Sequence, residues 1–329
     1  MKKIMLAAMA ALAITGCSQN EEFDTLSQNA EIGVGAVVKN TTRAEVTNNS
    51  SFKKFTVYSY ITEGNYVSTN NLGTAYMDGI NYTYESAWTN DAKEKYYWPT
   101  TASGKKIQFF AYPTDMIDAG SYTAPPTGYP SFAFTVAAES SSQKDLVVAN
   151  KNDMASNSVG VAAGSFQLDF THALTRINFA FIPAETGFTY TIESITVKGT
   201  KGGTGKYTFA STWDLSAATE SSYTYPIAQA AEKTEGKEYF LLGNAAASLM
   251  LFPQAVDDIS IDIKYKVNNS VMDIFDDTKT ISLSGTSAWA VGQNILYKLT
   301  LPVGGDLVGI TTEVGNWPNE AETPVVPAN

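Results

Sequence analysis

The single cysteine of the chain, Cys17, lies where its thiol is expected to be modified. Two lysines precede an apolar run over 4–14, which is too short to span about 30 Å of hydrocarbon as a mature helix. The run leads into Ile14-Thr15-Gly16-Cys17, a pattern typical of a lipobox. We therefore predict a lipoprotein signal peptide over 1–16 and a membrane anchor of acyl chains on Cys17. An ordinary signal peptide with an incidental cysteine is the alternative.

The chain offers little else for catalysis or metal binding. One cysteine and one histidine give no zinc-type spacing, and neither a Gly-x-Ser-x-Gly motif nor a phosphate loop occurs. The acidic pairs Asp257-Asp258 and Asp276-Asp277 suit glycoside hydrolysis or calcium binding only if they converge in space, and acidic surface turns explain them more simply. We expect no enzyme, no cofactor and no metal site.

Net charge also limits the partners. The chain carries 22 basic and 33 acidic residues, a formal charge of −11, whereas a protein that binds the phosphate backbone of a nucleic acid needs a basic face. We therefore expect no binding to nucleic acid. The lone His172 could titrate near pH 6.5, but a structural hydrogen bond at a strand end is the favoured interpretation.

Short strands are predicted over most of the chain that follows the signal peptide. The sequence contains 16 Phe and 18 Tyr, and apolar residues alternate with polar ones at many places. The predicted strands cover 55–60, 107–112, 145–149, 166–170, 177–181, 239–242, 249–252, 259–267, 295–301 and 308–314. Strands at such even spacing indicate antiparallel β-sandwiches.

The length of 329 residues is large for one sandwich, so two tandem sandwiches are expected. A small-residue stretch over 155–164 is the best boundary. The predicted division is a signal peptide over 1–16, an acidic tether over 17–30, and sandwich domains over 31–164 and 165–329. Turns are expected at 124–128, 268–269 and the glycine-rich 199–205, and short helical turns at 217–220 and 228–235.

Several segments occur in a familiar order: Lys95-Tyr96-Tyr97-Trp98-Pro99, 107–113, 144–149, 166–176, 249–254, 289–294 and Val314-Gly315-Asn316-Trp317. Together with the lipobox, this order resembles the fimbrillin family of Bacteroidales, the lipoprotein subunits of type V pili. The resemblance implies two tandem transthyretin-like sandwiches, a location at the outer membrane or cell surface, and a role as a pilus subunit or as a tip or accessory adhesin. It implies other pilus subunits as partners, with a ligand on a host or bacterial surface.

A strand near the start of the mature chain is predicted to be removable. Ile32, Val34, Ala36 and Val38 alternate with smaller residues, and two glycines make this strand a weak packer. A polar stretch follows it and contains Arg43, one of only two arginines. The resemblance implies that an arginine-specific protease cuts the bond between Arg43 and Ala44, which would free the protein from its lipid anchor. An ordinary loop arginine is the alternative.

Removal of a strand exposes unpaired backbone groups that a strand from another subunit can fill. The segment 307–314 is the candidate donor, and it presents Val308, Ile310, Thr312 and Val314 on one face. The same segment could instead complete its own domain. Prolines at 318, 324 and 327 lack amide donors and make a stalk role less favourable than a tip or accessory role.

A second functional hypothesis is a surface lipoprotein that binds glycans and does not polymerise. Aromatic side chains stack on sugars, and the candidates are the 18 tyrosines together with Trp88, Trp98, Trp213, Trp289 and Trp317. Packing in the sandwich cores is the simpler interpretation of these residues.

Overall fold

The computed structural model of the chain describes residues 30–38, 52–69, 71–227, 239–243, 248–304 and 306–316. Strands make up most of these residues, which confirms the all-β prediction. The helical segments among them are three short 3₁₀ turns, η1 (Thr101–Ser103), η2 (Ala119–Ser121) and η3 (Ser140–Ser142). The predicted signal peptide, Cys17, Arg43, Ala44 and Trp317 lie outside the described residues.

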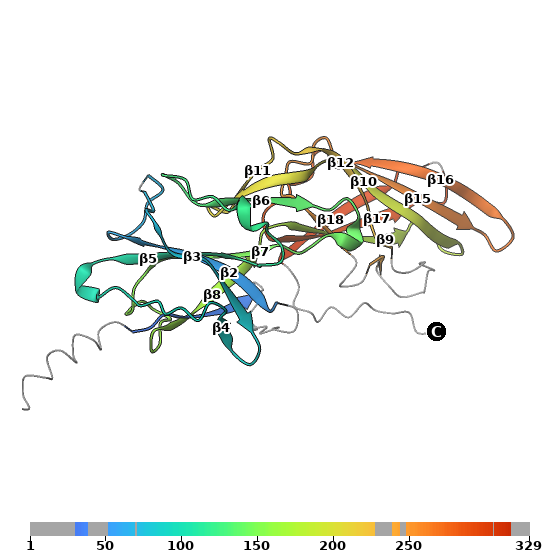
Figure 1. The fold of residues 1–329 in the computed structure, drawn as a ribbon. Coiled ribbons are helices and arrows are strands. Elements are labelled where there is room, and N and C mark those ends of the chain that lie inside the picture. Colours follow the sequence, from blue (N-terminus) through green and yellow to red (C-terminus); the bar gives the residue numbers. More distant parts are fainter. Residues whose placement is uncertain are drawn as a thin grey trace, which may run out of the picture.

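The first lobe is built on a seven-stranded sheet in the order β1-β8-β7-β5-β2-β3-β4 (Figure 1). Its first and last strands approach each other, so the sheet curves around its own core. Within it, β1 pairs with β8 in parallel and the other neighbours pair antiparallel. The strands are β1 (Gly33–Val38), β2 (Lys54–Thr62), β3 (Ala75–Tyr84), β4 (Trp88–Asn90), β5 (Lys106–Tyr112), β7 (Val147–Met154) and β8 (Ser165–His172).

The second lobe is a sandwich of two sheets. One sheet has the order β11-β10-β15-β16, with β12 and β6 also paired to β10, and the other has the order β13-β9-β17-β18, with β14 paired to β9. The strands are β6 (Ser131–Val136), β9 (Thr175–Pro183), β10 (Thr189–Thr208), β11 (Thr212–Asp214), β12 (Thr219–Thr224), β13 (Phe240–Leu241), β14 (Leu249–Leu251), β15 (Ser260–Asn268), β16 (Asp273–Ser282), β17 (Gln293–Leu301) and β18 (Gly309–Asn316).

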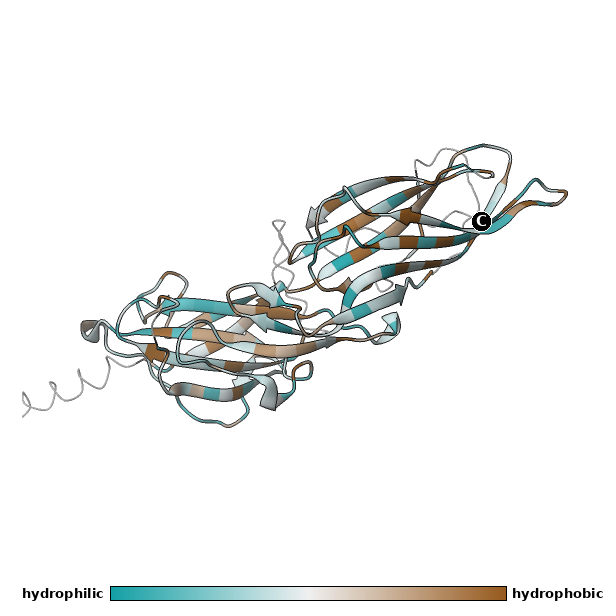
Figure 2. Ribbon diagram, turned by 90° about the horizontal axis from the view of Figure 1, so that it is seen from above, coloured by the Kyte–Doolittle hydropathy of each residue, from teal (hydrophilic) through white to brown (hydrophobic). Residues whose placement is uncertain are grey.

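Alternating residues explain why these strands form. Brown and teal bands follow one another along the strands of the second lobe, as expected where one face is buried (Figure 2). In β15, Ile261, Ile263 and Tyr265 are fully buried, and Ile295 and Tyr297 of β17 belong to the same apolar cluster. The two sheets therefore enclose one core between them.

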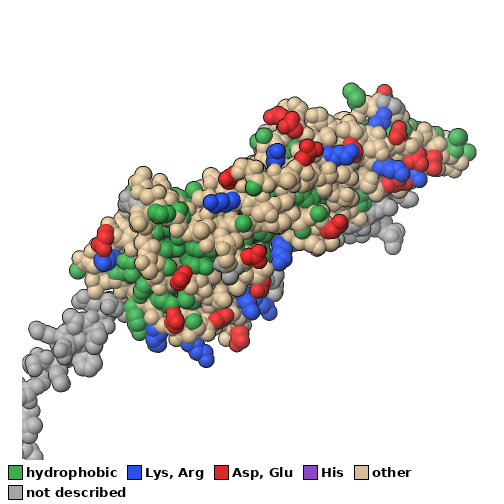
Figure 3. Space-filling view, turned by 45° about the horizontal axis from the view of Figure 1, so that its top comes forward, with side chains coloured by type: hydrophobic (Ala, Val, Ile, Leu, Met, Phe, Trp, Pro, Cys, Tyr) green, Lys and Arg blue, Asp and Glu red, His purple; other side chains and the backbone are tan. Residues whose placement is uncertain are grey.

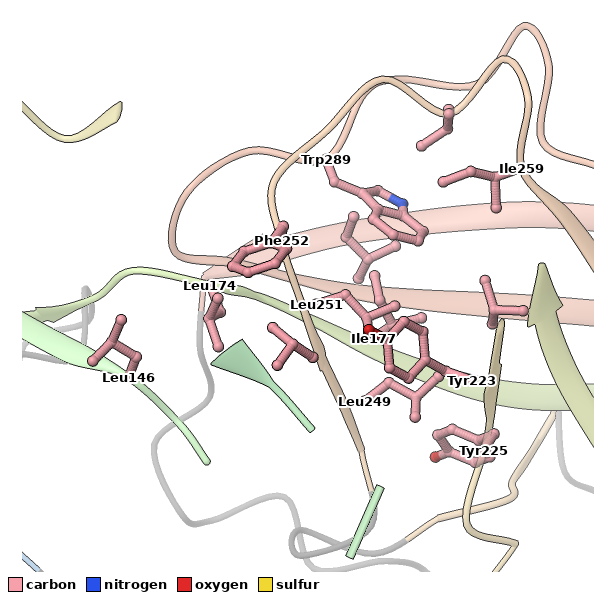
Figure 4. Close-up of a cluster of buried hydrophobic side chains, with 14 of the residues drawn as sticks. Leu146, Leu174, Ile177, Tyr223, Tyr225, Leu249, Leu251, Phe252, Ile259 and Trp289 are labelled. Carbon is pink, nitrogen blue, oxygen red and sulfur yellow. The ribbon is translucent and has the colours of Figure 1, made fainter. Parts of the chain in front are cut away.

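That core continues into the junction between the lobes. Figure 4 shows Leu146, which precedes β7, beside Leu174, which precedes β9, with Phe252 and Trp289 nearby. Trp289 donates from its indole N–H to Tyr297 at 2.8 Å, so its polar edge is satisfied inside the core. The junction is thus a packed apolar interior.

The chain passes between the lobes more than once. Strand β6 precedes the predicted boundary at 164/165 but pairs with residues 203–208 of β10. Strand β8 follows that boundary but lies in the seven-stranded sheet of the first lobe. The Asn150 amide of β7 also donates to the Phe209 carbonyl at 3.0 Å. Both lobes therefore contain strands from each half of the chain.

The prediction of a turn over 199–205 is wrong, because these residues lie inside the twenty-residue strand β10. Gly199 and Gly203 adopt positive φ and mark where β10 leaves β15 and β12 and reaches β6 and β11. A side chain at Gly199 would collide with the Asp258 carbonyl, which accounts for glycine there. The helical turn expected over 217–220 is also absent, since Thr219 begins β12.

Candidate functional site

The first strand, β1, and residues 30–32 before it fill a groove whose start has backbone partners on two sides. On one side it pairs in parallel with β8, with Val34 opposite Phe166 and Ala36 opposite Leu168. On the other side, the residues just before β1 are hydrogen-bonded to the segment 96–98. There the Ile32 N–H donates to the Tyr96 carbonyl at 2.7 Å and the Trp98 N–H donates to the Ala30 carbonyl at 3.0 Å. The start of β1 is therefore held from both sides, unlike an ordinary edge strand.

The inward face of β1 carries the residues predicted for a removable strand. Ile32, Val34 and Ala36 are buried in the core of the first lobe, and Val38 is half-buried. Full burial of a valine or isoleucine side chain contributes about 1.5–3 kcal/mol to the free energy of unfolding. The groove thus has an apolar floor that favours alternating aliphatic side chains.

Trp98 forms one wall of the groove. Its side chain is 1% exposed and packs edge-on against Phe109 and Phe166. Its indole N–H donates to the Gly164 carbonyl at 2.8 Å, and the same carbonyl accepts from the Gly33 N–H at 3.2 Å. This tryptophan occurs in one of the quoted family-like segments, but the sequence contained no signal that it contacts the start of β1.

The outward face of β1 explains its two glycines. A methyl group on Gly33 would lie 2.9 Å from Ser165 Cβ, and a methyl group on Gly35 would lie 2.7 Å from Gln167 Cδ. A side chain at either position would therefore require the β8 residue opposite it to move. Glycine at both positions lets β1 pair with β8 while Ser165 and Gln167 keep their present places.

Two charged or titratable groups lie beside the start of β1. Lys95 pairs with Glu31 at 2.9 Å in an exposed contact. Burial, with a smaller effect of the Glu31 charge, raises the pKa of Tyr82 to about 12. Tyr82 is 4% exposed and lies in the core that β1 covers.

The candidate donor segment forms an edge strand of a sheet in the second lobe. Strand β18 pairs antiparallel with β17, and no partner lies on its outer side among the described residues. Val308 and Ile310 are half-buried, whereas Thr312 is exposed and Val314 is 48% exposed. Lys298 of β17 pairs with Glu313 at 2.8 Å. In this structure the segment completes its own sheet along one edge.

The other chemistry-bearing residues are engaged in structural contacts. Arg176 is 9% exposed and donates from Nε to Ser248 Oγ at 2.8 Å. His172, the last residue of β8, contacts Asp145 Oδ1 through Nδ1 at 2.9 Å. Asp276 pairs with Lys266 at 3.5 Å on the β15–β16 hairpin, where acidic and basic side chains gather at one end of the molecule (Figure 3).

The described tryptophans offer no open platform for a sugar ring. Trp98 and Trp289 are buried, and Trp88 and Trp213 are half-buried against other aromatic rings. Among the described residues, no three His, Cys, Asp or Glu side chains are arranged to hold a metal ion. That part of the chain also contains no helix long and apolar enough to cross a membrane.

The fold and the groove define an all-β protein with a sandwich lobe and a first strand held in a groove at a sheet edge. The family model described as fimbrillin-like matches residues 42–317, and the chain belongs to that family. The resemblance predicted from the ordered motifs is thus confirmed. No curated protein matches the chain.

Solved structures with the same fold come from Bacteroides species. A fimbrial protein from Bacteroides vulgatus is 19% identical, with a TM-score of 0.63 over 88% of this chain and 100% of that chain. Candidate cell adhesion proteins from Bacteroides uniformis and Bacteroides ovatus are 12% and 15% identical, each with a TM-score of 0.52. They cover 88% and 89% of this chain, and 100% and 99% of their own chains respectively.

Proposed function

We propose that this protein is a pilus subunit or a tip or accessory adhesin that matures by losing β1 and then accepts a strand from another subunit. Family membership supports the fimbrial role. The observation that carries the mechanism is the groove itself, because β1 pairs with β8 over an apolar floor and the residues just before it bond to the segment 96–98 on the other side. A strand that leaves such a site exposes groups that another strand can pair with.

Arg43 is the proposed cleavage site. It follows β1 by five positions and precedes β2, so a cut there separates β1 from the rest of the chain without breaking a described strand. The other arginine, Arg176, is buried and bonded, which protects it from an arginine-specific protease. The protease is thus expected to cut the folded protein once.

The anchor and location follow from the same proposal. Cys17 carries the lipid that holds the protein at the outer membrane, and cleavage after Arg43 releases the remainder for assembly at the cell surface. Labelling of cells with a fatty-acid analogue should mark the wild-type chain and leave the Cys17→Ala variant unmarked.

Limited digestion tests the maturation step. The folded protein is treated with an arginine-specific protease, the cut is located by mass spectrometry, and assembly is followed by size-exclusion chromatography. We expect one cut after Arg43, release of the segment that contains β1, and growth of stable oligomers. The Arg43→Lys variant is the matched control, since it keeps the charge and removes the cleavage site.

Two results separate the parts of this proposal. A single cut that leaves a monomer supports a tip or accessory role that requires a different donor. Resistance of Arg43 in the folded protein overturns the maturation step. The result would then favour an uncleaved surface lipoprotein.

A further inference from the structure

The outward face of the groove presents two side chains of β8 to whatever strand lies beside it. Ser165 is opposite Gly33 and Gln167 is opposite Gly35, and both β8 residues are exposed to solvent on their far side. Each glycine therefore lies directly under a polar side chain. The two positions differ in how easily that side chain can move away.

At the first position the obstruction is rigid. A methyl group on Gly33 would lie within 2.9 Å of Ser165 Cβ and 3.3 Å of Ser165 Cα, and closer still to the hydroxyl oxygen. Rotation of the serine side chain moves only its hydroxyl oxygen. Relief of the clash with Cβ and Cα requires the backbone of β8 to shift at Ser165, where two backbone hydrogen bonds with Ala162, at 2.8 and 2.9 Å, hold it.

At the second position the obstruction is flexible. The three atoms nearest to a methyl group on Gly35 would all belong to the end of Gln167, including Nε2 at 2.5 Å and Cδ at 2.7 Å. Because this glutamine is exposed, its amide can rotate into water at little cost. A side chain at this position therefore displaces Gln167 without moving the backbone.

We infer that Ser165 and Gln167 act as a size filter along the groove, in which Ser165 admits only glycine and Gln167 yields to a larger residue. The strands that fit carry an aliphatic residue on each side of the glycine that faces Ser165. This inference rests on the proposal that β1 is exchanged, and it identifies the residues that select the incoming strand.

The committed occupant is residues 308–314 of a second copy of this chain. In the register of β1, Gly309 takes the place of Gly33 under Ser165, with Val308 and Ile310 in place of Ile32 and Val34. Thr311 then takes the place of Gly35, where only Gln167 has to move. Val314 occupies the position of Val38, so the aliphatic positions of the two segments coincide at three of four inward sites.

The filter is tested first in the intact full chain, where β1 itself is the occupant. Hydrogen exchange of the amides over 32–38 should rise about 5- to 150-fold in Gly33→Ala, the range expected for overpacking. Addition of Ser165→Gly should return the rate to within about threefold of Ser165→Gly alone. Gly35→Ala is the matched control and should change exchange by less than about threefold. Equal effects at the two glycines, or no rescue, would overturn the filter.

The incoming strand is tested with fluorescent peptides of residues 306–316 added to the full chain cut after Arg43. The wild-type peptide should bind, and the Gly309→Ala peptide should bind about 5- to 150-fold more weakly unless the protein carries Ser165→Gly. The Thr311→Gly peptide should bind like wild type. Equal binding of the wild-type and Gly309→Ala peptides contradicts the filter. If no peptide binds while the intact chain behaves as expected, the exchange proposed above fails and the filter on β1 stands.

Discussion

The two terminal edge strands of the described chain differ in how they are held. Strand β1 buries Val34 and Ala36 and pairs with β8, and residues 30–32 before it bond to the segment 96–98, whereas β18 has one partner strand and exposes most of its length. By these contacts β1 is the more firmly bound strand, although it is the one proposed to leave. A cut next to such a strand does not by itself release it, so exchange needs an incoming strand that fills the groove equally well.

The largest effect is expected at the wall of the groove. Trp98→Ala should lower the free energy of unfolding by about 3–5 kcal/mol, because it empties a buried site against Phe109 and Phe166 in the core that β1 covers. Chemical denaturation measures this loss, and Trp98→Phe, which keeps most of the packing, should lose much less. A small effect of Trp98→Ala would show that β1 is not held as the contacts indicate.

Matched truncations compare the two strands directly. Val34→Ala in β1 should cost about 2 kcal/mol, because the removed methyl groups are buried. Ile310→Ala in β18 removes more atoms but should cost only about 1 kcal/mol, because its side chain is half-buried. Urea titration of both variants gives the order. If Ile310→Ala is the more destabilising, the comparison of the two strands is wrong.

Alkaline pH provides a third comparison, since Tyr82 lies in the core that β1 covers and β18 contains no tyrosine. Burial raises the pKa of Tyr82 to about 12 in the folded state, against about 10 when unfolded. Its contribution to stability is complete below pH 10 and is lost as the pH rises from 10 to 12.

The Tyr82→Phe variant should therefore lose less stability over that interval, by up to about 1.4 kcal/mol per pH unit. Tyr265, whose pKa burial also raises to about 12, remains in the variant as an internal reference. Identical pH profiles for wild type and Tyr82→Phe would show that Tyr82 titrates normally.

Surface charge should distinguish the two strands least. Lys298→Ala should cost about 0.2–1 kcal/mol, because its pair with Glu313 is half-exposed and screened by salt. Lys95→Ala, beside β1, should leave stability unchanged because its pair with Glu31 is exposed. Thermal unfolding at low and high salt tests both. A large loss for Lys95→Ala would show that β1 depends on charge as well as on packing.

Strands with one buried face were predictable from local alternation. Ile261, Ile263 and Tyr265 in β15 show this pattern, as do Ile295 and Tyr297 in β17, and both strands form where expected. Strand β10 was not predicted. One reason is that four glycines interrupt the alternating pattern, and glycine is also used where one strand bends between two sheets. The family resemblance was predictable because several short motifs kept their order.

The groove itself was only half predictable. The alternation of Ile32, Val34 and Ala36 identified its occupant, but the parallel pairing with β8 joins residues about 130 positions apart and leaves no local signal. The glycines of β1 indicated weak packing from the sequence alone. The structure shows instead that Gly33 and Gly35 permit a close approach, which depends on the side chains of a distant strand.

Strand β10 has a mechanical consequence for the fibre role proposed above. Its twenty residues extend up to about 65 Å, and its hydrogen bonds to β15 and β12 at one end and to β6 at the other make it a continuous tie through the molecule. Tension along this direction loads many hydrogen bonds in shear at once, so rupture requires them to fail together. The bend at Gly199 and Gly203 is the point where such a tie would first straighten under load.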